Sequence, residues 1–129
     1  MSSSREAVSA SAAPPAIGPY SHAVRAGDLL FCSGQISLDP ATGELVGATA
    51  PEQARRCLQN LEAVCDAAGT SLGRALRLTV YMTDLDEFAA INEVYETFFA
   101  SEAPARVAVE VSRLPRGAQV EIDAIVLTG

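Results

Sequence analysis

The stretch 104–126 constrains the fold of this chain most strongly, because apolar and polar residues alternate along it in two segments. Valine stands at every second position from Val107 to Val111, and valine, isoleucine or alanine at every second position from Val120 to Val126. Such a period-two pattern predicts half-buried β-strands. The sequence Leu-Pro-Arg-Gly at 114–117 predicts a tight turn between them. We therefore expect a β-hairpin whose apolar residues pack under the helices.

Arg106 and Glu121 stand on the polar faces of these two strands. A fixed guanidinium near a fixed carboxylate can hold an anionic substrate and activate a water molecule. A cross-strand salt bridge on a solvated face explains the same pattern, and the pattern alone favours this second interpretation. A functional role for the pair therefore needs support from elsewhere in the sequence.

The composition excludes several kinds of chemistry. The length of 129 residues suits one domain, and the net charge of −7 argues against a nucleic-acid partner, which a basic patch would normally attract. All nine basic residues are Arg, so a lysine Schiff base and a P-loop are impossible. The single histidine, His22, leaves no His-rich metal site within one chain. We expect neither a cofactor nor a metal.

The cysteines and the hydropathy pattern bear on location. Cys32, Cys57 and Cys65 lack the spacing of a metal or redox motif, and Cys57 and Cys65 share the apolar face of a predicted helix. No segment approaches the length of a membrane span, and no apolar run follows the first residues as a secretory signal requires. We expect a reduced, cytoplasmic protein without a membrane partner.

Taken in order along the chain, the sequence predicts an N-terminal tail, several strands and two helices. Residues 1–15 are rich in Ser, Ala and Pro and predict a disordered N-terminal tail, so residues 16–129 form the domain. Alternation predicts a hairpin over 22–33 and a strand over 75–82. Amphipathic helices are expected over 49–69 and 84–98, the first opened by a Thr-x-x-Glu capping box.

This order of elements predicts an α+β fold of two layers, with two helices on one face of a mixed or antiparallel sheet. The chain offers nothing to cover the other face of the sheet. A partner subunit, in a closed ring, is the expected cover.

Five motifs, taken together and in order, resemble the RidA/YjgF family of enamine/imine deaminases over 17–127. They are Gly18-Pro19-Tyr20-Ser21, Ser33-Gly34-Gln35-Ile36, Ile91-Asn92-Glu93-Val94-Tyr95, Pro104-Ala105-Arg106, and Leu114-Pro115 followed by Val120-Glu121-Ile122-Asp123. The resemblance implies a chorismate-mutase-like fold and a homotrimer with clefts between neighbouring subunits.

The resemblance also assigns roles. It implies that Arg106 binds the substrate carboxylate and that Glu121 helps to hold the attacking water. The other pocket residues that it implies are Tyr20, Ser33, Gly34, Asn92 and Ala108. Position 108, often Cys in the family, contributes a backbone carbonyl, a role that Ala108 keeps.

The implied reaction is hydrolysis of 2-aminoacrylate-like enamines or imines to 2-keto acids and ammonia. An imine carbon is already electrophilic, so the reaction needs no covalent nucleophile. Three alternatives remain open: a related deaminase for a larger substrate such as 2-aminomuconate, a ligand-binding trimer without catalysis, and a ribonuclease, which the acidic charge and single histidine disfavour. We expect His22 to be a surface or interface residue.

Overall fold

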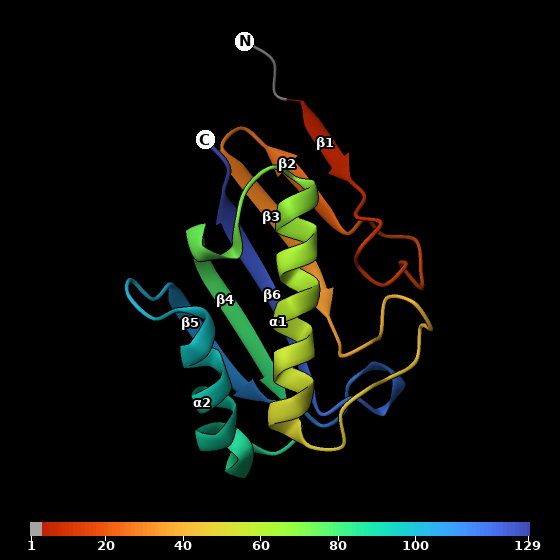
Figure 1. Cartoon of the computed structure of the whole chain (residues 1–129), viewed down its shortest axis with the longest axis vertical. Helices are drawn as coiled ribbons and strands as arrows, with labels where there is room; N and C mark the ends of the chain where they lie inside the picture. Colours follow the sequence, from red (N-terminus) through yellow and green to blue (C-terminus); the bar gives the residue numbers. More distant parts are fainter. Residues whose placement is uncertain (1–3) are drawn as a thin grey trace.

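The computed structural model describes residues 4–129. It consists of a six-stranded sheet that two helices cover on one face (Figure 1). The strands are β1 (Arg5–Val8), β2 (Ala23–Ala26), β3 (Leu29–Gln35), β4 (Ala75–Met82), β5 (Ala105–Glu110) and β6 (Val120–Leu127). Their order in the sheet is β1-β2-β3-β6-β4-β5, and only the β4–β5 pair is parallel. The predicted α+β architecture with a mixed sheet is therefore confirmed.

Helix α1 (Ala50–Ala67) begins and ends where its sequence signals predict. The Thr49 hydroxyl accepts a hydrogen bond from the Glu52 N–H, and the Glu52 carboxylate accepts one from the Thr49 N–H. This reciprocal capping satisfies two N–H groups that the first turn leaves without helical partners. Gly69, with φ of 79°, follows the helix in the left-handed conformation that terminates it.

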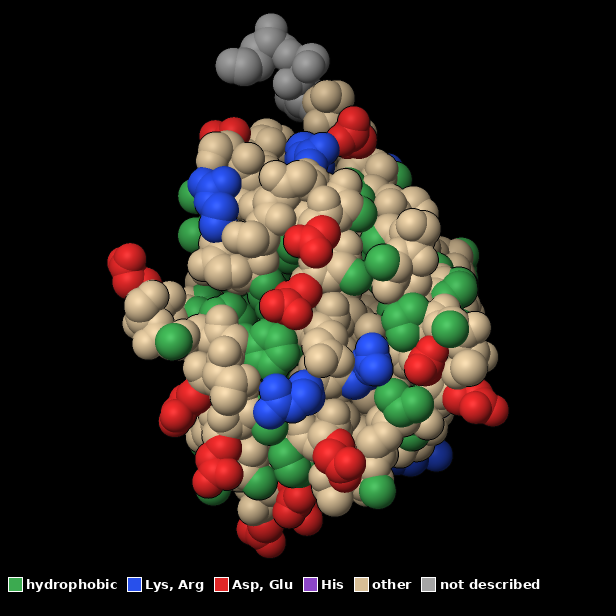
Figure 2. Space-filling model, in the orientation of Figure 1, with side chains coloured by type: hydrophobic (Ala, Val, Ile, Leu, Met, Phe, Trp, Pro, Cys, Tyr) green, Lys and Arg blue, Asp and Glu red, His purple; other side chains and the backbone are tan. Residues whose placement is uncertain are grey.

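Helix α2 (Phe88–Phe98) and three short 3₁₀ turns complete the fold. The turns are η1 (Leu72–Arg74), η2 (Leu85–Glu87) and η3 (Pro115–Gly117). No helix among residues 4–129 is long and apolar enough to cross a membrane. The helix-covered face carries interspersed acidic and basic side chains with small apolar patches between them (Figure 2).

The core lies between the helices and the inner face of the sheet. Alternate residues of three strands point into it, and each fully buried aliphatic side chain stabilises the fold by roughly 1.5–3 kcal/mol. These residues are Leu30 and Cys32 from β3, Leu78, Val80 and Met82 from β4, and Val120, Ile122, Ala124 and Val126 from β6. The inner face of β6 is therefore the one that the alternation predicts.

The predicted hairpin over 104–126 is wrong. Strand β5 pairs in parallel with β4, whereas β6 lies between β3 and β4 and is antiparallel to both. Because α2 returns the chain to the sheet edge beside β4, β5 never meets β6. The valine face is also reversed: Val107 and Val109 are 43% and 37% exposed on the face away from the helices, and Ala108 packs against the core.

The prediction of a disordered tail over 1–15 is wrong where the structure describes it, and residues 1–3 lie outside the described part. Strand β1 pairs antiparallel with β2 at the sheet edge, and Val8, Ala10 and Ala13 are buried. Backbone pairing and small apolar side chains order this segment although it has no strong hydrophobic run.

The sheet face opposite the helices is open. It exposes Phe31 from β3 and the two β5 valines, and it carries the polar outward-facing residues of β4 and β6. Exposed large apolar side chains on an uncovered sheet face are typical of a surface that another subunit covers.

Candidate active site

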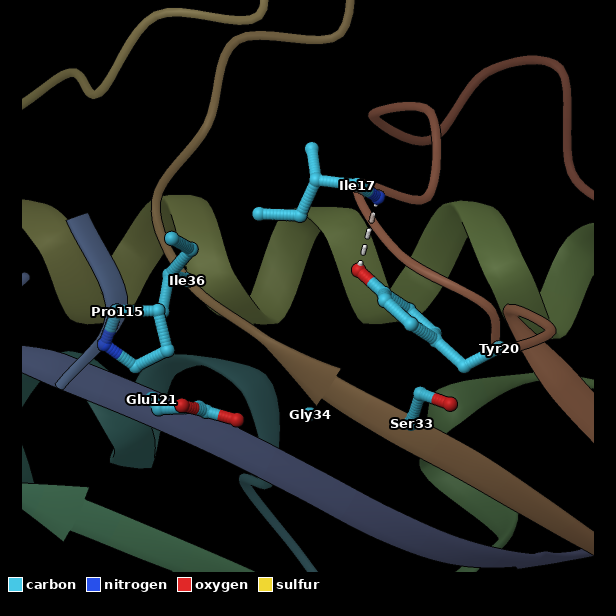
Figure 3. Close-up of a pocket in the computed structure, with 7 residues that line it drawn as sticks. All are labelled: Ile17, Tyr20, Ser33, Gly34, Ile36, Pro115 and Glu121. Atoms are coloured by element: carbon cyan, nitrogen blue, oxygen red, sulfur yellow. Dashed lines mark hydrogen bonds between the residues drawn. The ribbon is translucent and has the colours of Figure 1, made fainter.

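A cavity of about 320 Å³ opens where β3 and β6 run side by side. Figure 3 shows Tyr20 and Ser33 at one end of this cavity and Ile36 and Pro115 at the other. Its full lining is Ile17, Tyr20, Ser33, Gly34, Ile36, Pro115 and Glu121. Four of the seven predicted site residues therefore meet in one cavity, which we call the base cavity after its carboxylate.

The Glu121 carboxylate lies directly over Gly34. A Cβ atom added at Gly34 would stand 2.1 Å from Glu121 Oε2, so position 34 must be glycine for the carboxylate to occupy this place. The strand pairing of β3 with β6 shifts register between Cys32 and Gln35, which forms a bulge at the glycine. The close contact between Gly34 and the Glu121 carboxylate therefore forms within one chain.

The surroundings of Glu121 raise the pKa of its carboxyl group. Partial burial raises the pKa of the Glu121 carboxyl, and the Asp123 carboxylate on the same strand face raises it further. The Tyr81 hydroxyl donates to Asp123 Oδ2 at 3.2 Å. A carboxylate with a raised pKa takes a proton from water more readily than an ordinary one, which suits a general base.

Backbone contacts hold the other polar residues of the base cavity. The Ser33 hydroxyl donates to the Ser21 carbonyl at 2.6 Å, and the Ile17 N–H donates to the Tyr20 hydroxyl at 3.3 Å (Figure 3). The Tyr20 hydroxyl keeps its own proton free to donate. These contacts fix both side chains against the cavity wall.

A second cavity, of about 390 Å³, contains the predicted cation. Arg106 and Asn92 line it together with Tyr95, Glu96, Ala103 and Pro104. Arg106 Nη1 donates to Asn92 Oδ1 at 2.6 Å. We call this the arginine cavity.

The base cavity and the arginine cavity lie on opposite faces of the sheet. Arg106 is paired with Leu78, whose side chain is in the core, and its guanidinium contacts α2 on the helix side. Glu121 alternates with the buried Val120 and Ile122, so it projects from the open face. Within one chain the predicted cation and base therefore do not meet, and Ala108 lines neither cavity.

Sequence reasoning missed several residues of both cavities. Ile17, Ile36 and Pro115 line the base cavity, although all three adjoin or belong to the motifs quoted above. Phe88 and Tyr95, whose rings contact Arg106, follow the spacing of an ordinary apolar helix stripe. The signal for these two aromatic residues is their helical spacing with Asn92, shortly before the strand that contains Arg106.

His22 is a structural anchor rather than a surface residue. It is 7% exposed, and the Ala10 N–H donates to its Nδ1 at 2.9 Å. Its Nε2 therefore carries the proton and donates to the Pro14 carbonyl at 2.8 Å. The expectation of a surface or interface histidine is wrong, because both ring nitrogens bind the N-terminal segment.

The cysteines are buried thiols. Cys32, Cys57 and Cys65 are unpaired, and burial raises the pKa of Cys57, whose thiol faces the Val120 carbonyl at 3.6 Å. A buried thiol with a raised pKa is a poor nucleophile. Between residues 4 and 129 no group of three or more His, Cys, Asp or Glu side chains could hold a metal ion.

The comparisons cover nearly the whole chain. A family model described as Endoribonuclease L-PSP matches residues 10–128. A RutC family protein of Sinorhizobium fredii is 54% identical over 121 residues, which are 94% of this chain and 96% of that protein. The 2-iminobutanoate/2-iminopropanoate deaminase of Mus musculus is 42% identical over 125 residues, 97% of this chain and 93% of that protein.

A solved structure gives the same result at the level of the fold. The crystal structure of RidA from an Antarctic Psychrobacter has a TM-score of 0.91 at 40% identity, and the match covers 95% of this chain and 98% of that one. Fold and sequence thus place the chain in one class of small α+β proteins. The chain belongs to the RidA/YjgF family.

Proposed function

We propose that this protein is a deaminase that hydrolyses 2-aminoacrylate-like enamines or imines to 2-keto acids and ammonia. The observation that carries the proposal is the Glu121 carboxylate held over Gly34 in an open cavity, with a pKa raised by burial. Relatives named 2-iminobutanoate/2-iminopropanoate deaminase at about 42% identity support the reaction class.

In the proposed mechanism Arg106 binds the substrate carboxylate through its planar fork of N–H donors. A water held by Glu121 and the Ala108 carbonyl adds through its oxygen to the imine carbon, and its proton passes to Glu121. Glu121 returns that proton to nitrogen, which gives a carbinolamine. Glu121 then transfers the proton of the new hydroxyl group to the same nitrogen, the C–N bond breaks, and ammonia leaves as the keto C=O forms. Tyr20, Ser33 and Asn92 line the pocket and orient the substrate.

A homotrimer is part of the proposal. Arg106 and Glu121 face opposite sides of one sheet, so a complete site takes the arginine cavity from one copy and the base cavity from its neighbour. The exposed apolar residues on the open sheet face support contact with a second copy. Unpaired cysteines suit the cytoplasm, where we place the protein.

A ribonuclease activity, which the description of the family model suggests, is not proposed. The net charge of −7 gives RNA little electrostatic attraction. The one histidine has both ring nitrogens bound to backbone groups, so it offers no free acid or base.

A coupled assay tests the proposed function. A pyridoxal-phosphate-dependent dehydratase generates the imine, and keto-acid release is followed with and without this protein. Loss of a charge-assisted pair costs about 1.5–3 kcal/mol, so Arg106→Ala should slow the release about 10- to 100-fold. The exposed Arg55→Ala on α1 is the matched control and should keep the wild-type rate.

Three outcomes decide between the alternatives. No acceleration by the wild-type protein, or a wild-type rate for Arg106→Ala, contradicts the proposal. Tight binding of 2-ketobutyrate without turnover favours the ligand-binding trimer. A higher rate on 2-aminomuconate than on the small imine favours the deaminase for a larger substrate.

A further inference from the structure

The face of α2 that looks toward β5 carries three residues at helical spacing. Phe88, Asn92 and Tyr95 stand at positions i, i+4 and i+7, which place their side chains along one side of the helix. Strand β5 pairs with β4 so that Arg106 projects toward this side. Sequence spacing and strand register together bring one cation against two aromatic rings and an amide.

Within residues 4–129, the hydrogen bond and the cation–π contacts of the Arg106 guanidinium are with this helix face. Its Cζ lies 5.1 Å from the centroid of the Phe88 ring and 4.9 Å from that of Tyr95. Asn92 Oδ1 accepts from Nη1. Both ring distances fall within the range in which a guanidinium is attracted to an aromatic face.

The contacts leave the charge of Arg106 available. Within residues 4–129 no carboxylate lies within ion-pair distance of the guanidinium. Ring faces attract a cation without accepting its N–H hydrogens, so the donors not used by Asn92 stay free for a carboxylate. An aspartate or glutamate partner would hold the side chain equally well but would compete with an anionic ligand.

Packing fixes the ring of Tyr95. Tyr95 is 6% exposed, and its ring lies 4.8 Å from that of Phe99, centroid to centroid. Its hydroxyl is buried and has no hydrogen-bond partner in the described chain. The ring therefore stays in place without help from the hydroxyl, which makes Tyr95→Phe a control that keeps the aromatic face.

We propose that Phe88 and Tyr95 are positioning residues, which hold the Arg106 guanidinium in the orientation that binds the substrate carboxylate. The identity of the anion rests on the proposed function; the held guanidinium does not. A freely rotating arginine loses conformational entropy each time it binds, and a pre-oriented one loses less. Removing either ring face should therefore weaken carboxylate binding about 3- to 10-fold.

The first test does not depend on the enzymatic reaction. Arginine-selective NMR of the full chain measures rotation of the Arg106 guanidinium, with the signal assigned by its loss in Arg106→Met. We expect slow rotation and ring-shifted signals in the wild type and in Tyr95→Phe, and faster rotation in Phe88→Leu and Tyr95→Leu. Unchanged rotation in both leucine variants overturns the proposal. Phe88 is only partly buried, so Phe88→Leu decides the point if Tyr95→Leu does not fold.

The second test separates positioning from general packing. Calorimetric titration with sodium 2-ketobutyrate should show the 3- to 10-fold weaker binding in the leucine variants, none in Tyr95→Phe, and no further loss when Phe88→Leu is added to Arg106→Met. An equal loss in the Arg106→Met background overturns the proposal, because the ring then acts independently of the arginine. If the wild-type protein does not bind 2-ketobutyrate, the carboxylate role of Arg106 is refuted, and the proposed function with it. The NMR experiment still decides whether the rings hold the guanidinium.

Discussion

Gly34 and the Glu121 carboxylate occupy space that only a hydrogen atom at position 34 leaves free. Gly34→Ala should push the carboxylate aside and lower the turnover rate about 100-fold, the usual contribution of a general base. The coupled assay measures the rate, and thermal melting verifies the fold. Gly73→Ala is the matched control, because its nearest neighbour would lie at 3.8 Å. A Gly34→Ala protein with full activity would show that the carboxylate need not lie over the glycine.

Asp123 sets part of the proton affinity of Glu121. Burial and the Asp123 charge both raise the pKa of Glu121, and Tyr81 faces both carboxyl groups from the neighbouring strand. Asp123→Asn removes the like charge, so the pKa of Glu121 should fall. Because a base is inactive once protonated, the acid limb of the pH profile of kcat/KM should move to lower pH. A limb that stays in place or moves upward contradicts this assignment.

Single residues were predictable from motifs but not from pattern alone. The alternation of β6 correctly places Glu121 opposite the core. The pattern could not distinguish Phe88 and Tyr95 from ordinary core residues, because an aromatic stripe on a helix looks the same whether it packs on aliphatic chains or on a guanidinium.

At the scale of elements, the helices were predictable and the strand partners were not. The capping box is a local signal, and α1 begins where it predicts. Period-two alternation says that a segment is a strand with two unlike faces, but not which strand lies beside it. Strand β5 therefore looked like the first half of a hairpin, whereas the crossover through α2 pairs it with β4.

The His22 side chain orders the segment that follows β1. His22 binds Ala10 and Pro14, and the chain then continues to Ile17 and Tyr20 in the wall of the base cavity. His22→Phe removes both hydrogen bonds, and amide hydrogen exchange over 9–16 should become about 10-fold faster or more. His22→Gln supplies an acceptor and a donor and should restore much of the protection. Exchange in His22→Phe as slow as in the wild type would contradict the anchoring role.

At the scale of the whole molecule, the division of the proposed site between copies can be tested by mixing. Arg106→Ala and Glu121→Gln should each be at least about 10-fold slower than the wild type as pure proteins. Co-expressed in equal amounts, copies that assemble at random should place both intact residues in about a quarter of the sites. The coupled assay on the purified mixture should recover activity in that proportion. A mixture as inactive as its components would mean that each chain supplies both residues of its own site.

The placement of the proposed cation and base on opposite sides of one sheet has a consequence for how the enzyme matures. Under the proposed function, a newly folded chain presents Arg106 on one face of its sheet and Glu121 on the other, so a single copy has no complete site. Under the proposed assembly, association becomes the final step of synthesis, and the amount of working enzyme depends on how many copies have found each other.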